Sequence, residues 1–220
     1  MIKVERDATF KDIIRSIRNV KDSDFKVPHS LKNILRNYQK DGFRWLKTMA
    51  NYGFGGILAD DMGIGKTLQV ITLLEDEKLH DPQAISLVVC PSSLILNWQS
   101  EIAKFSDALT SILITGNMEE RKALIYKAKD YDVVITSYDY LKRDIEHYEN
   151  FHFTYQIIDE AQYIKNHNTK NAVSVKQIQA AHRFALTGTP IENSLAELWS
   201  IFDFLMPGYL YTYPYFKKQY

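Results

Sequence analysis

The sequence predicts an α/β fold with a mostly parallel central sheet. Short apolar runs that are typical of buried strands alternate with longer stretches of helical periodicity. A glycine-rich turn joins one apolar run to the helical stretch behind it, and polar residues follow most of the other runs. This alternation is typical of βαβ units, whose strands end at one edge of the sheet and bind ligands there. The 220 residues, 45% of them hydrophobic, suffice for one large domain or two small ones.

The composition excludes several classes of protein. The 27 Lys and Arg residues balance the 27 Asp and Glu residues, so net charge neither indicates nor excludes a polyanionic partner. Cys90 is the single cysteine, which rules out an intrachain disulfide and favours a reducing compartment. No apolar run approaches the roughly 18 residues that cross a bilayer, so no membrane partner is expected. The six histidines show no metal-binding spacing.

Residues 1–27 are expected to form an N-terminal arm outside a main domain at 28–220. Four apolar residues of the arm recur at the spacing of one helical face: Phe10, Ile13, Ile14 and Ile17. Such a stripe fits a helix that docks on another domain or a helix that packs on the core, and we favour the second interpretation.

Segment 31–46 has the apolar spacing of a pair of helices. It contains Tyr38 and Gln39, shortly before the glycine-rich turn. The amide of Gln39 can read an adenine edge with one donor and one acceptor. A dipeptide alone is a weak signal, and a surface glutamine is the alternative.

The glycine-rich turn has the sequence LADDMGIGKT at 58–67. An apolar run at 55–58 precedes it and a helical stretch follows it, as in the phosphate-binding loop of nucleoside triphosphatases. It departs from the strict motif at Asp60, where glycine is usual. The alternative is a glycine turn beside a chance Lys-Thr pair.

The residue types of this turn suit a bound nucleotide. Gly63 and Gly65 let successive amides and a helix N-terminus face phosphate oxygens. Lys66 can then reach the β- and γ-phosphates of ATP, and the Thr67 hydroxyl can bind Mg²⁺. The other loop residues assigned to this site are Asp61, Met62 and Ile64.

Five further apolar runs are predicted as strands, each followed by a helical stretch: 86–90, 111–115, 132–136, 155–159 and 184–187. The last two carry most of the remaining polar residues of interest at their C-terminal ends.

The run at 155–159 ends in Asp159 and is followed by Glu160. A carboxylate at the end of a strand beside the phosphate loop is placed to bind Mg²⁺. Glu160 is then placed to orient or deprotonate the water that attacks the γ-phosphate. Two adjacent carboxylates at a buried strand end repel each other unless a cation is present. The alternative is a solvated Asp-Glu pair at a helix start, which is common for any one such pair.

Taken together these motifs resemble the first motor lobe of a superfamily-two helicase, and more narrowly the Swi/Snf-type DNA translocases, which include chromatin remodellers. The resemblance covers residues 31–210. It rests on six segments: LRNYQKDGFRWL, LADDMGIGKT, PSSLILNWQSEIAKF, TSYDYL, IIDEAQYIKN and LTGTPIENSLAELWSIFDFLMPG. It implies a RecA-like three-layer fold, and Asp60 is usual in this family.

The resemblance also implies roles at matching positions. Gln39 would contact adenine, Lys66 and Thr67 the phosphates and Mg²⁺, and Asp159 and Glu160 the metal and the water. Gln162 is assigned to the nucleotide-binding residues as well. Together with Thr187, Gly188 and Thr189 it would couple the state of the nucleotide to the binding of DNA. Contacts with the DNA backbone are implied for Ser92, Ser93, Thr136, Ser137, Tyr138, Lys165 and Asn166. For the Ser and Thr residues the alternative is a helix cap after a strand.

Several features concern the whole protein. Most family members have histidine where this chain has Gln162, which points to a bacterial or archaeal branch. Such motors have a second lobe that supplies arginines to the ATP site, and no arginine follows Arg183. We therefore expect an excised first lobe of an enzyme that hydrolyses ATP and moves along double-stranded DNA. A protein cargo bound to DNA would be a further partner. The location would be cytoplasmic in a prokaryote and nuclear in a eukaryote.

Two other functions stay open from the sequence. One is a binding module that is controlled by a bound nucleotide but does not hydrolyse it. The presence of Lys66, Thr67, Asp159 and Glu160 favours an active enzyme instead. The other is an RNA helicase lobe, which the turn around Thr189 disfavours.

Overall fold

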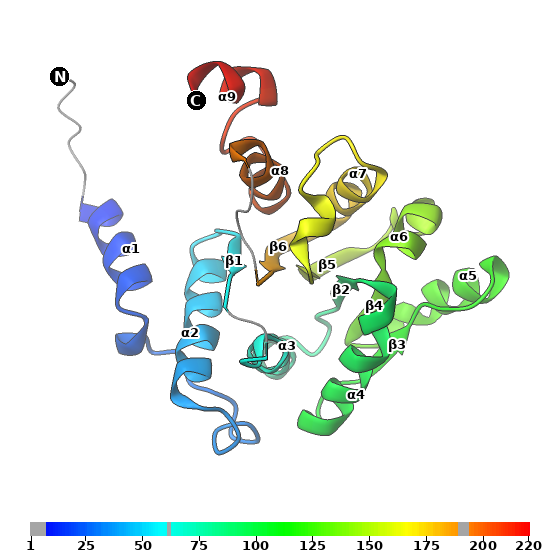
Figure 1. Cartoon of the computed structure of the whole chain (residues 1–220). Helices are drawn as coiled ribbons and strands as arrows, with labels where there is room; N and C mark the ends of the chain where they lie inside the picture. Colours follow the sequence, from blue (N-terminus) through cyan, green and yellow to red (C-terminus); the bar gives the residue numbers. More distant parts are fainter. Residues whose placement is uncertain (1–7, 61–62, 189–193) are drawn as a thin grey trace.

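The computed structural model describes residues 8–60, 63–188 and 194–220, and within them one six-stranded sheet lies between two layers of helices (Figure 1). The strands are β1 (Gly56–Leu58), β2 (Ser86–Cys90), β3 (Ser111–Leu113), β4 (Val133–Ser137), β5 (His152–Ile158) and β6 (Gln179–Leu186). The helices are α1 (Ala8–Arg18), α2 (Asn37–Asn51), α3 (Lys66–His80), α4 (Ile95–Phe105), α5 (Met118–Lys127), α6 (Tyr138–Asp144), α7 (Lys170–Gln177), α8 (Leu195–Leu205) and α9 (Tyr213–Gln219). None of these helices is long and apolar enough to cross a bilayer.

The strand order is β1-β6-β5-β2-β4-β3, and all neighbouring pairs are parallel. The predicted α/β fold with a mostly parallel sheet is therefore confirmed. This order places β5 between β6 and β2, so the ends of β1, β6, β5, β2 and β4 follow one another along a single edge. The phosphate loop leaves β1 at this edge, and Asp159 follows β5 there.

The side chains of the strands alternate between two cores, as the period of two requires. In β2, Leu87 and Val89 pack in a core that includes residues of α5, α6, α7 and α8. Val88 and Cys90 pack in the opposite core, with residues of α2, α3 and α4. Both faces of the parallel sheet are thus covered, which gives the three layers seen in Figure 1.

The structure corrects two predicted elements. The first half of segment 31–46 forms turns rather than a helix, and α2 begins only at Asn37. These turns already bury Leu31 and Leu35 against Leu68, so no helix is needed there to cover the core. Strand β6 begins at Gln179 rather than near residue 184, because its first half pairs with β5.

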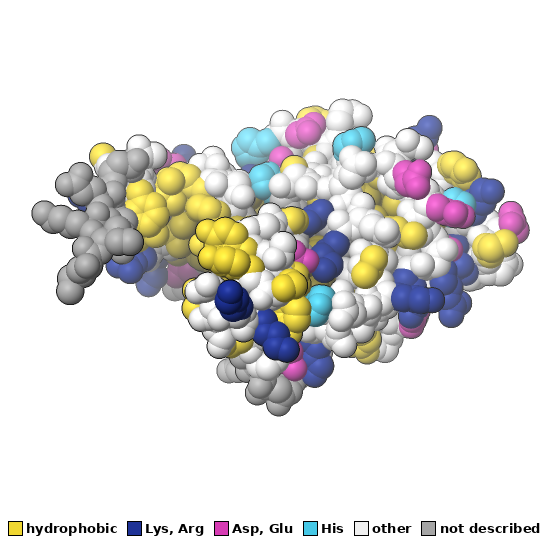
Figure 2. All heavy atoms as spheres, turned by 90° about the horizontal axis from the view of Figure 1, so that it is seen from above, with side chains coloured by type: hydrophobic (Ala, Val, Ile, Leu, Met, Phe, Trp, Pro, Cys, Tyr) yellow, Lys and Arg dark blue, Asp and Glu magenta, His cyan; other side chains and the backbone are white. Residues whose placement is uncertain are grey.

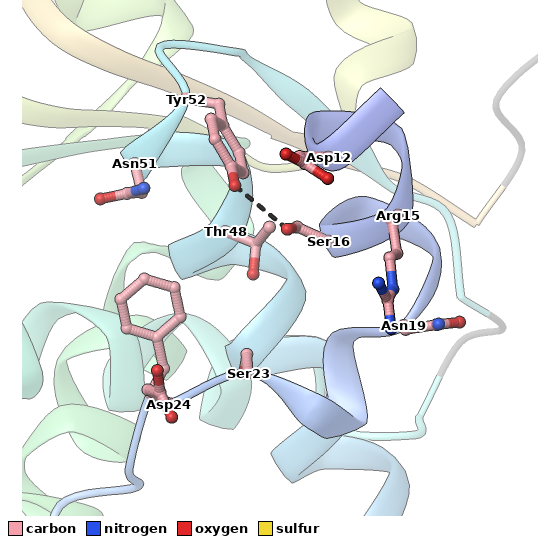
Figure 3. Close-up of a pocket in the computed structure, with 10 residues that line it drawn as sticks. Asp12, Arg15, Ser16, Asn19, Ser23, Asp24, Thr48, Asn51 and Tyr52 are labelled. Carbon is pink, nitrogen blue, oxygen red and sulfur yellow. Dashed lines mark hydrogen bonds between the residues drawn. The ribbon is translucent and has the colours of Figure 1, made fainter. Parts of the chain in front are cut away.

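Helix α1 lies beside α2, and no residue of α1 is buried (Figure 1). Phe10 of the predicted apolar stripe is 43% exposed. The Tyr52 hydroxyl of the segment after α2 donates a hydrogen bond to Ser16 Oγ at 3.1 Å, beside a cavity of about 580 Å³ (Figure 3). Lining residues Thr48 and Asn51 place this cavity at the C-terminal end of α2. The phosphate loop contacts the other end of that helix.

Charged side chains of both signs are interspersed over the face shown in Figure 2, whereas hydrophobic side chains gather toward one end of it. The mixture agrees with the zero formal net charge of the sequence. No single sign of charge dominates this face, so it does not by itself indicate a polyanionic partner.

Candidate nucleotide-binding and catalytic site

The phosphate loop joins β1 to α3 in the way that the sequence predicts. Gly63 and Gly65 have φ values of 83° and 80°, in the left-handed region that glycine adopts without steric cost. Gly65 is the N-cap of α3, so the first amides of that helix face the loop. Gly63 is exposed, and a Cβ there would meet no atom within 4 Å. This geometry fits bound phosphate groups. Asp61 and Met62 lie outside the described residues.

Lys66 is the first residue of α3. Its ammonium group donates a hydrogen bond to the main-chain oxygen of Asp60 at 2.6 Å, so it lies across the loop. The contact uses the backbone of Asp60 rather than its side chain, and a glycine at this position would offer the same oxygen. Thr67 follows in the first turn and is half-buried.

Helix α2 contacts the loop through its first residues. The amide nitrogen of Gln39 donates to Ile64 O at 3.1 Å, and the Tyr38 hydroxyl donates to the same oxygen at 2.9 Å. The amide oxygen of Gln39 accepts from Arg36 N at 2.9 Å, and the residue is 7% exposed. Gln39 is therefore not the surface glutamine of the alternative interpretation. It holds the loop, and its contact with adenine stays a prediction.

Asp159 directly follows β5, and its carboxylate is held at both oxygens. The indole N–H of Trp98 donates to Oδ2 at 2.9 Å, and the amide of Glu160 donates to Oδ1 at 2.9 Å. Burial raises the pKa of Asp159, and the charge of Glu160 acts in the same direction. The two hydrogen bonds and the positive charge of Lys66 act against this rise in pKa. Asp159 and Glu160 are both half-buried, and a cation stabilises two such adjacent carboxylates, so these residues fit Mg²⁺.

The described residues contain no group of three or more His, Cys, Asp or Glu side chains that could hold a metal by themselves. Magnesium in phosphoryl-transfer sites is usually bound by one or two side chains together with phosphate oxygens and water. The pair that the sequence predicts, Thr67 and Asp159, suits this kind of site.

Glu160 has a φ of 52° and a ψ of 59°, which is unusual for a residue with a side chain. Its carboxylate accepts a hydrogen bond from the Gln162 amide at 2.6 Å. The amide oxygen of Gln162 in turn accepts from the Thr187 hydroxyl at 3.3 Å. A chain of hydrogen bonds thus links Glu160 to the end of β6, where Gly188 follows. Thr189 lies outside the described residues.

The residues predicted to contact DNA fall into two groups. Ser92, Ser93, Lys165 and Asn166 are exposed, so their predicted contacts are sterically open. The prediction needs correction for three others, which are 0–2% exposed and cannot reach DNA in this conformation: Thr136, Ser137 and Tyr138.

The structure gives two of these buried residues other contacts. The Ser137 hydroxyl accepts from Tyr140 N at 3.2 Å and caps α6, which is the alternative that the sequence left open. The Tyr138 hydroxyl donates to Asp159 O at 2.8 Å. Burial raises the pKa of Tyr138, so the hydroxyl keeps the proton that it donates.

Of the two aromatic residues that contact Asp159, sequence reasoning missed Trp98 and gave Tyr138 a different role, in DNA binding. Trp98 and Tyr138 each lie in the helix that follows a strand ending at this edge. A tryptophan or tyrosine buried in such a place needs a partner for its polar group, and the nearest strand end supplies it. The need of a buried indole or phenol for a hydrogen-bond partner was the signal in the sequence that could have indicated these contacts.

Comparisons with known proteins identify the family of the chain. The model of the SNF2-related domain family matches residues 38–220. TATA-binding protein-associated factor 172 of Homo sapiens is 41% identical over 211 residues, which cover 90% of this chain and 11% of that protein. The uncharacterized ATP-dependent helicase MG018 of Mycoplasma genitalium is 41% identical over 189 residues, which cover 86% of this chain and 18% of that protein. This chain thus spans less than a fifth of either relative.

Two solved structures show the same fold. The SWI2/SNF2 ATPase core of Sulfolobus solfataricus in complex with double-stranded DNA has a TM-score of 0.78 and 45% identity, over 84% of this chain and 38% of that one. The core domain solved as "Sulfolobus solfataricus SWI2/SNF2 ATPase core domain" has a TM-score of 0.76 and 41% identity, over 90% of this chain and 39% of that one. The chain therefore belongs to the SNF2-related domain family, helicase-like ATPases whose RecA-like fold its sheet and helices share.

Proposed function

We propose that this chain is the ATP-binding first lobe of a motor that couples ATP hydrolysis to movement along double-stranded DNA. The observation that carries the proposal is the meeting of three parts at one edge of the sheet. These parts are the phosphate loop before α3, the carboxylates Asp159 and Glu160 after β5, and the Thr187 turn after β6. The loop and the carboxylates supply the groups that ATP hydrolysis needs on one side of the nucleotide.

Each residue of the site has a role in this proposal. The amides at the start of α3 and the ammonium of Lys66 would bind the phosphates. Thr67 and Asp159 would hold Mg²⁺, which supplies charge neutralisation at the β- and γ-phosphates when it is bound. Glu160 would orient the attacking water and accept its proton. Gln162 touches both Glu160 and Thr187, so a shift of the β6 turn would change the position of the Glu160 carboxylate.

Duplex DNA as the track is supported by the archaeal core, which was solved on double-stranded DNA and is 45% identical to this chain. The exposed residues Ser92, Ser93, Lys165 and Asn166 would contact phosphate and sugar oxygens. Such contacts position a protein on DNA and carry little sequence information. A second lobe would complete the ATP site, and a protein bound to DNA would be the cargo, as the name of the human relative suggests.

Loss of nucleotide binding in Lys66→Ala tests the ATP site. A charged hydrogen bond of this kind contributes about 1.5–3 kcal/mol, so the variant is expected to bind Mg·ATP about 10- to 150-fold more weakly. Titration calorimetry with ATP and MgCl₂ measures the affinity, and circular dichroism checks the fold. Lys170→Ala, which removes an exposed lysine of α7, is the matched control. An affinity of Lys66→Ala within twofold of the unmodified chain would show that the phosphates bind elsewhere.

A further inference from the structure

Trp98 contacts the candidate site through a hydrogen bond to which the proposed function assigns no role. Its indole nitrogen lies 2.9 Å from Asp159 Oδ2, and 61 positions separate the two residues in sequence. An indole N–H can only donate, so the direction of this hydrogen bond is unambiguous. Trp98 is 1% exposed, so its indole N–H is shielded from water, while the Asp159 carboxylate is half-buried.

Packing fixes the indole ring in this position. Trp98 lies on the face of α4 that also buries Ile95 and Ile102, and all three belong to the core that contains Val88 and Cys90 of β2. Because β2 is the immediate neighbour of β5 in the sheet, the helix that follows β2 brings its buried face next to the end of β5. The donor is therefore held by rigid elements, which is what positioning of a ligand side chain requires.

The rest of Asp159 is constrained as well. Its amide donates to Val89 O at 2.8 Å, and its carbonyl oxygen accepts from the Tyr138 hydroxyl at 2.8 Å. The backbone is thus fixed from both sides, and the carboxylate keeps only rotation about its side-chain torsions. The Glu160 amide holds one oxygen from within the same turn. The bond from Trp98 is the contact from another element that fixes the second oxygen.

We propose that Trp98 is a positioning residue that orients the Asp159 carboxylate toward Mg²⁺ in the nucleotide complex. The inference rests on the proposed function, in which Asp159 holds that ion. Groups that hydrogen-bond a metal-binding side chain usually change metal affinity by about 10- to 100-fold when they are removed. The competing explanation is that Trp98 only fills the core and satisfies its N–H on the nearest acceptor. In that case its loss would lower stability without changing how nucleotide binding depends on Mg²⁺.

The test measures binding rather than turnover. The anisotropy of mant-AMPPNP, excited directly at the mant group, reports its affinity for the chain as free Mg²⁺ is raised. Trp98→Phe keeps an aromatic ring and removes the donor. In this variant, the Mg²⁺ concentration at which the gain in nucleotide affinity is half-maximal is expected to rise about 10- to 100-fold. The affinity measured in EDTA should stay unchanged, because the partner of the indole is the metal-binding carboxylate rather than a phosphate-binding group.

Trp199→Phe is the matched control. Trp199 is also buried, at 6% exposure, and its indole N–H donates to Tyr211 O at 3.3 Å, away from the site. This variant should leave the Mg²⁺ dependence unchanged. Should Trp98→Phe fail to fold, β-(3-benzothienyl)alanine placed at position 98 keeps the size of the indole and replaces its N–H by sulfur.

The Asp159→Asn background separates the possible outcomes. If Trp98 acts through Asp159, Trp98→Phe adds no further shift in that background. The inference would be overturned if Trp98→Phe shifted the half-maximal Mg²⁺ concentration equally in both backgrounds. It would also be overturned if Trp98→Phe left that concentration within twofold of the unmodified chain while Asp159→Asn alone shifted it. If Asp159→Asn itself changes nothing, the metal role in the proposed function is wrong, and the inference falls with it.

Discussion

Glu160 stands out at the scale of single residues because its backbone lies in the left-handed region. A residue with a Cβ in this region costs of order 1 kcal/mol, and such residues persist where surrounding contacts hold them. Here the contacts are the bond from Gln162 and the amide of Glu160 itself on Asp159. The turn directs two adjacent carboxylates to different partners, which is the arrangement that separate roles in metal binding and water activation need.

Glu160→Gln is expected to separate nucleotide binding from hydrolysis. The amide keeps the size of the side chain and an oxygen for Gln162, but it cannot accept a proton. A longer protein that includes a second motor lobe should therefore keep its affinity for Mg·ATP and lose about 10²- to 10⁴-fold in turnover. Calorimetry and steady-state phosphate release measure the two quantities. A loss of affinity as large as that of Lys66→Ala would indicate that Glu160 holds the loop or the metal instead.

At the scale of elements, α5 depends on its ends more than on its apolar face. Its buried residues are Arg121 and Ile125. At its start Asn117 Oδ1 accepts from Glu120 N at 3.1 Å, and Glu120 Oε2 accepts from Asn117 N at 2.7 Å. This reciprocal pair satisfies donors that the first turn of a helix otherwise leaves open.

Asn117→Ala is expected to lower the free energy of unfolding by about 1 kcal/mol, because it removes the N-cap acceptor. Urea denaturation followed by circular dichroism gives the change. Asn117→Asp is the control, since aspartate caps as well as asparagine and should stay close to the unmodified chain. Equal losses in both variants would mean that the side-chain amide has another role.

The second support of α5 is an ion pair to α6. Arg121 Nε and Nη2 donate to the two oxygens of Asp144 at 2.6 Å and 2.8 Å, and the two side chains are 7% and 3% exposed. The hydrogen bond to Asp144 raises the pKa of Arg121. Arg121 Nη1 also donates to Gly116 O at 2.8 Å, just before the capped turn.

Asp144→Ala is expected to destabilise the chain by about 3–5 kcal/mol, because it leaves a buried guanidinium without its partner. The double variant Arg121→Met with Asp144→Leu replaces both charges by apolar groups and should lose much less. Unfolding free energies of the matching single variants, Arg121→Met and Asp144→Leu, and of the double variant give the coupling energy. If the double variant is as unstable as the sum of the singles, the pair does not act as a unit.

At the scale of the whole molecule, the chain presents one side of the proposed ATP site. The phosphate loop and both carboxylates lie on a single sheet edge, and the proposed motor needs a second lobe to face them. The solved archaeal core is more than twice as long as the part that this chain matches, since the match covers 38% of it.

The 220-residue chain alone is expected to bind ATP weakly and to show almost no DNA-stimulated hydrolysis. An arginine supplied to the γ-phosphate contributes roughly 10³–10⁵ in rate in related phosphoryl-transfer enzymes, and a second lobe would supply it. Few DNA phosphates would be neutralised by one lobe, so DNA binding should be weak and should fall steeply with salt. ATPase assays with and without duplex DNA, run beside a two-lobed version, measure the difference. Equal DNA-stimulated turnover in both would contradict the two-lobe mechanism.

The sequence by itself determined the fold class and the main parts of the site. Strand and helix periodicity, glycine positions and the ends of apolar runs are local properties, and parallel strands always bring their ends to one edge. This is why local patterns alone suffice to place the phosphate loop, Asp159 and Glu160 together. The left-handed backbone conformation of Glu160 and the capping role of Ser137 also depend on residues that are near in sequence.

Only the tertiary structure decided which distant residues meet at that edge. Strand order and helix faces set the contacts of Trp98 and Tyr138 with Asp159, and of Gln39 with Ile64. The same packing buries Thr136 and makes it unavailable to DNA. No local pattern encodes these contacts, because each joins segments at least 21 residues apart whose neighbours are chosen by the sheet order. The physical reason is that a side chain packs against the elements that are its neighbours in space, and the strand order of the sheet determines which elements those are.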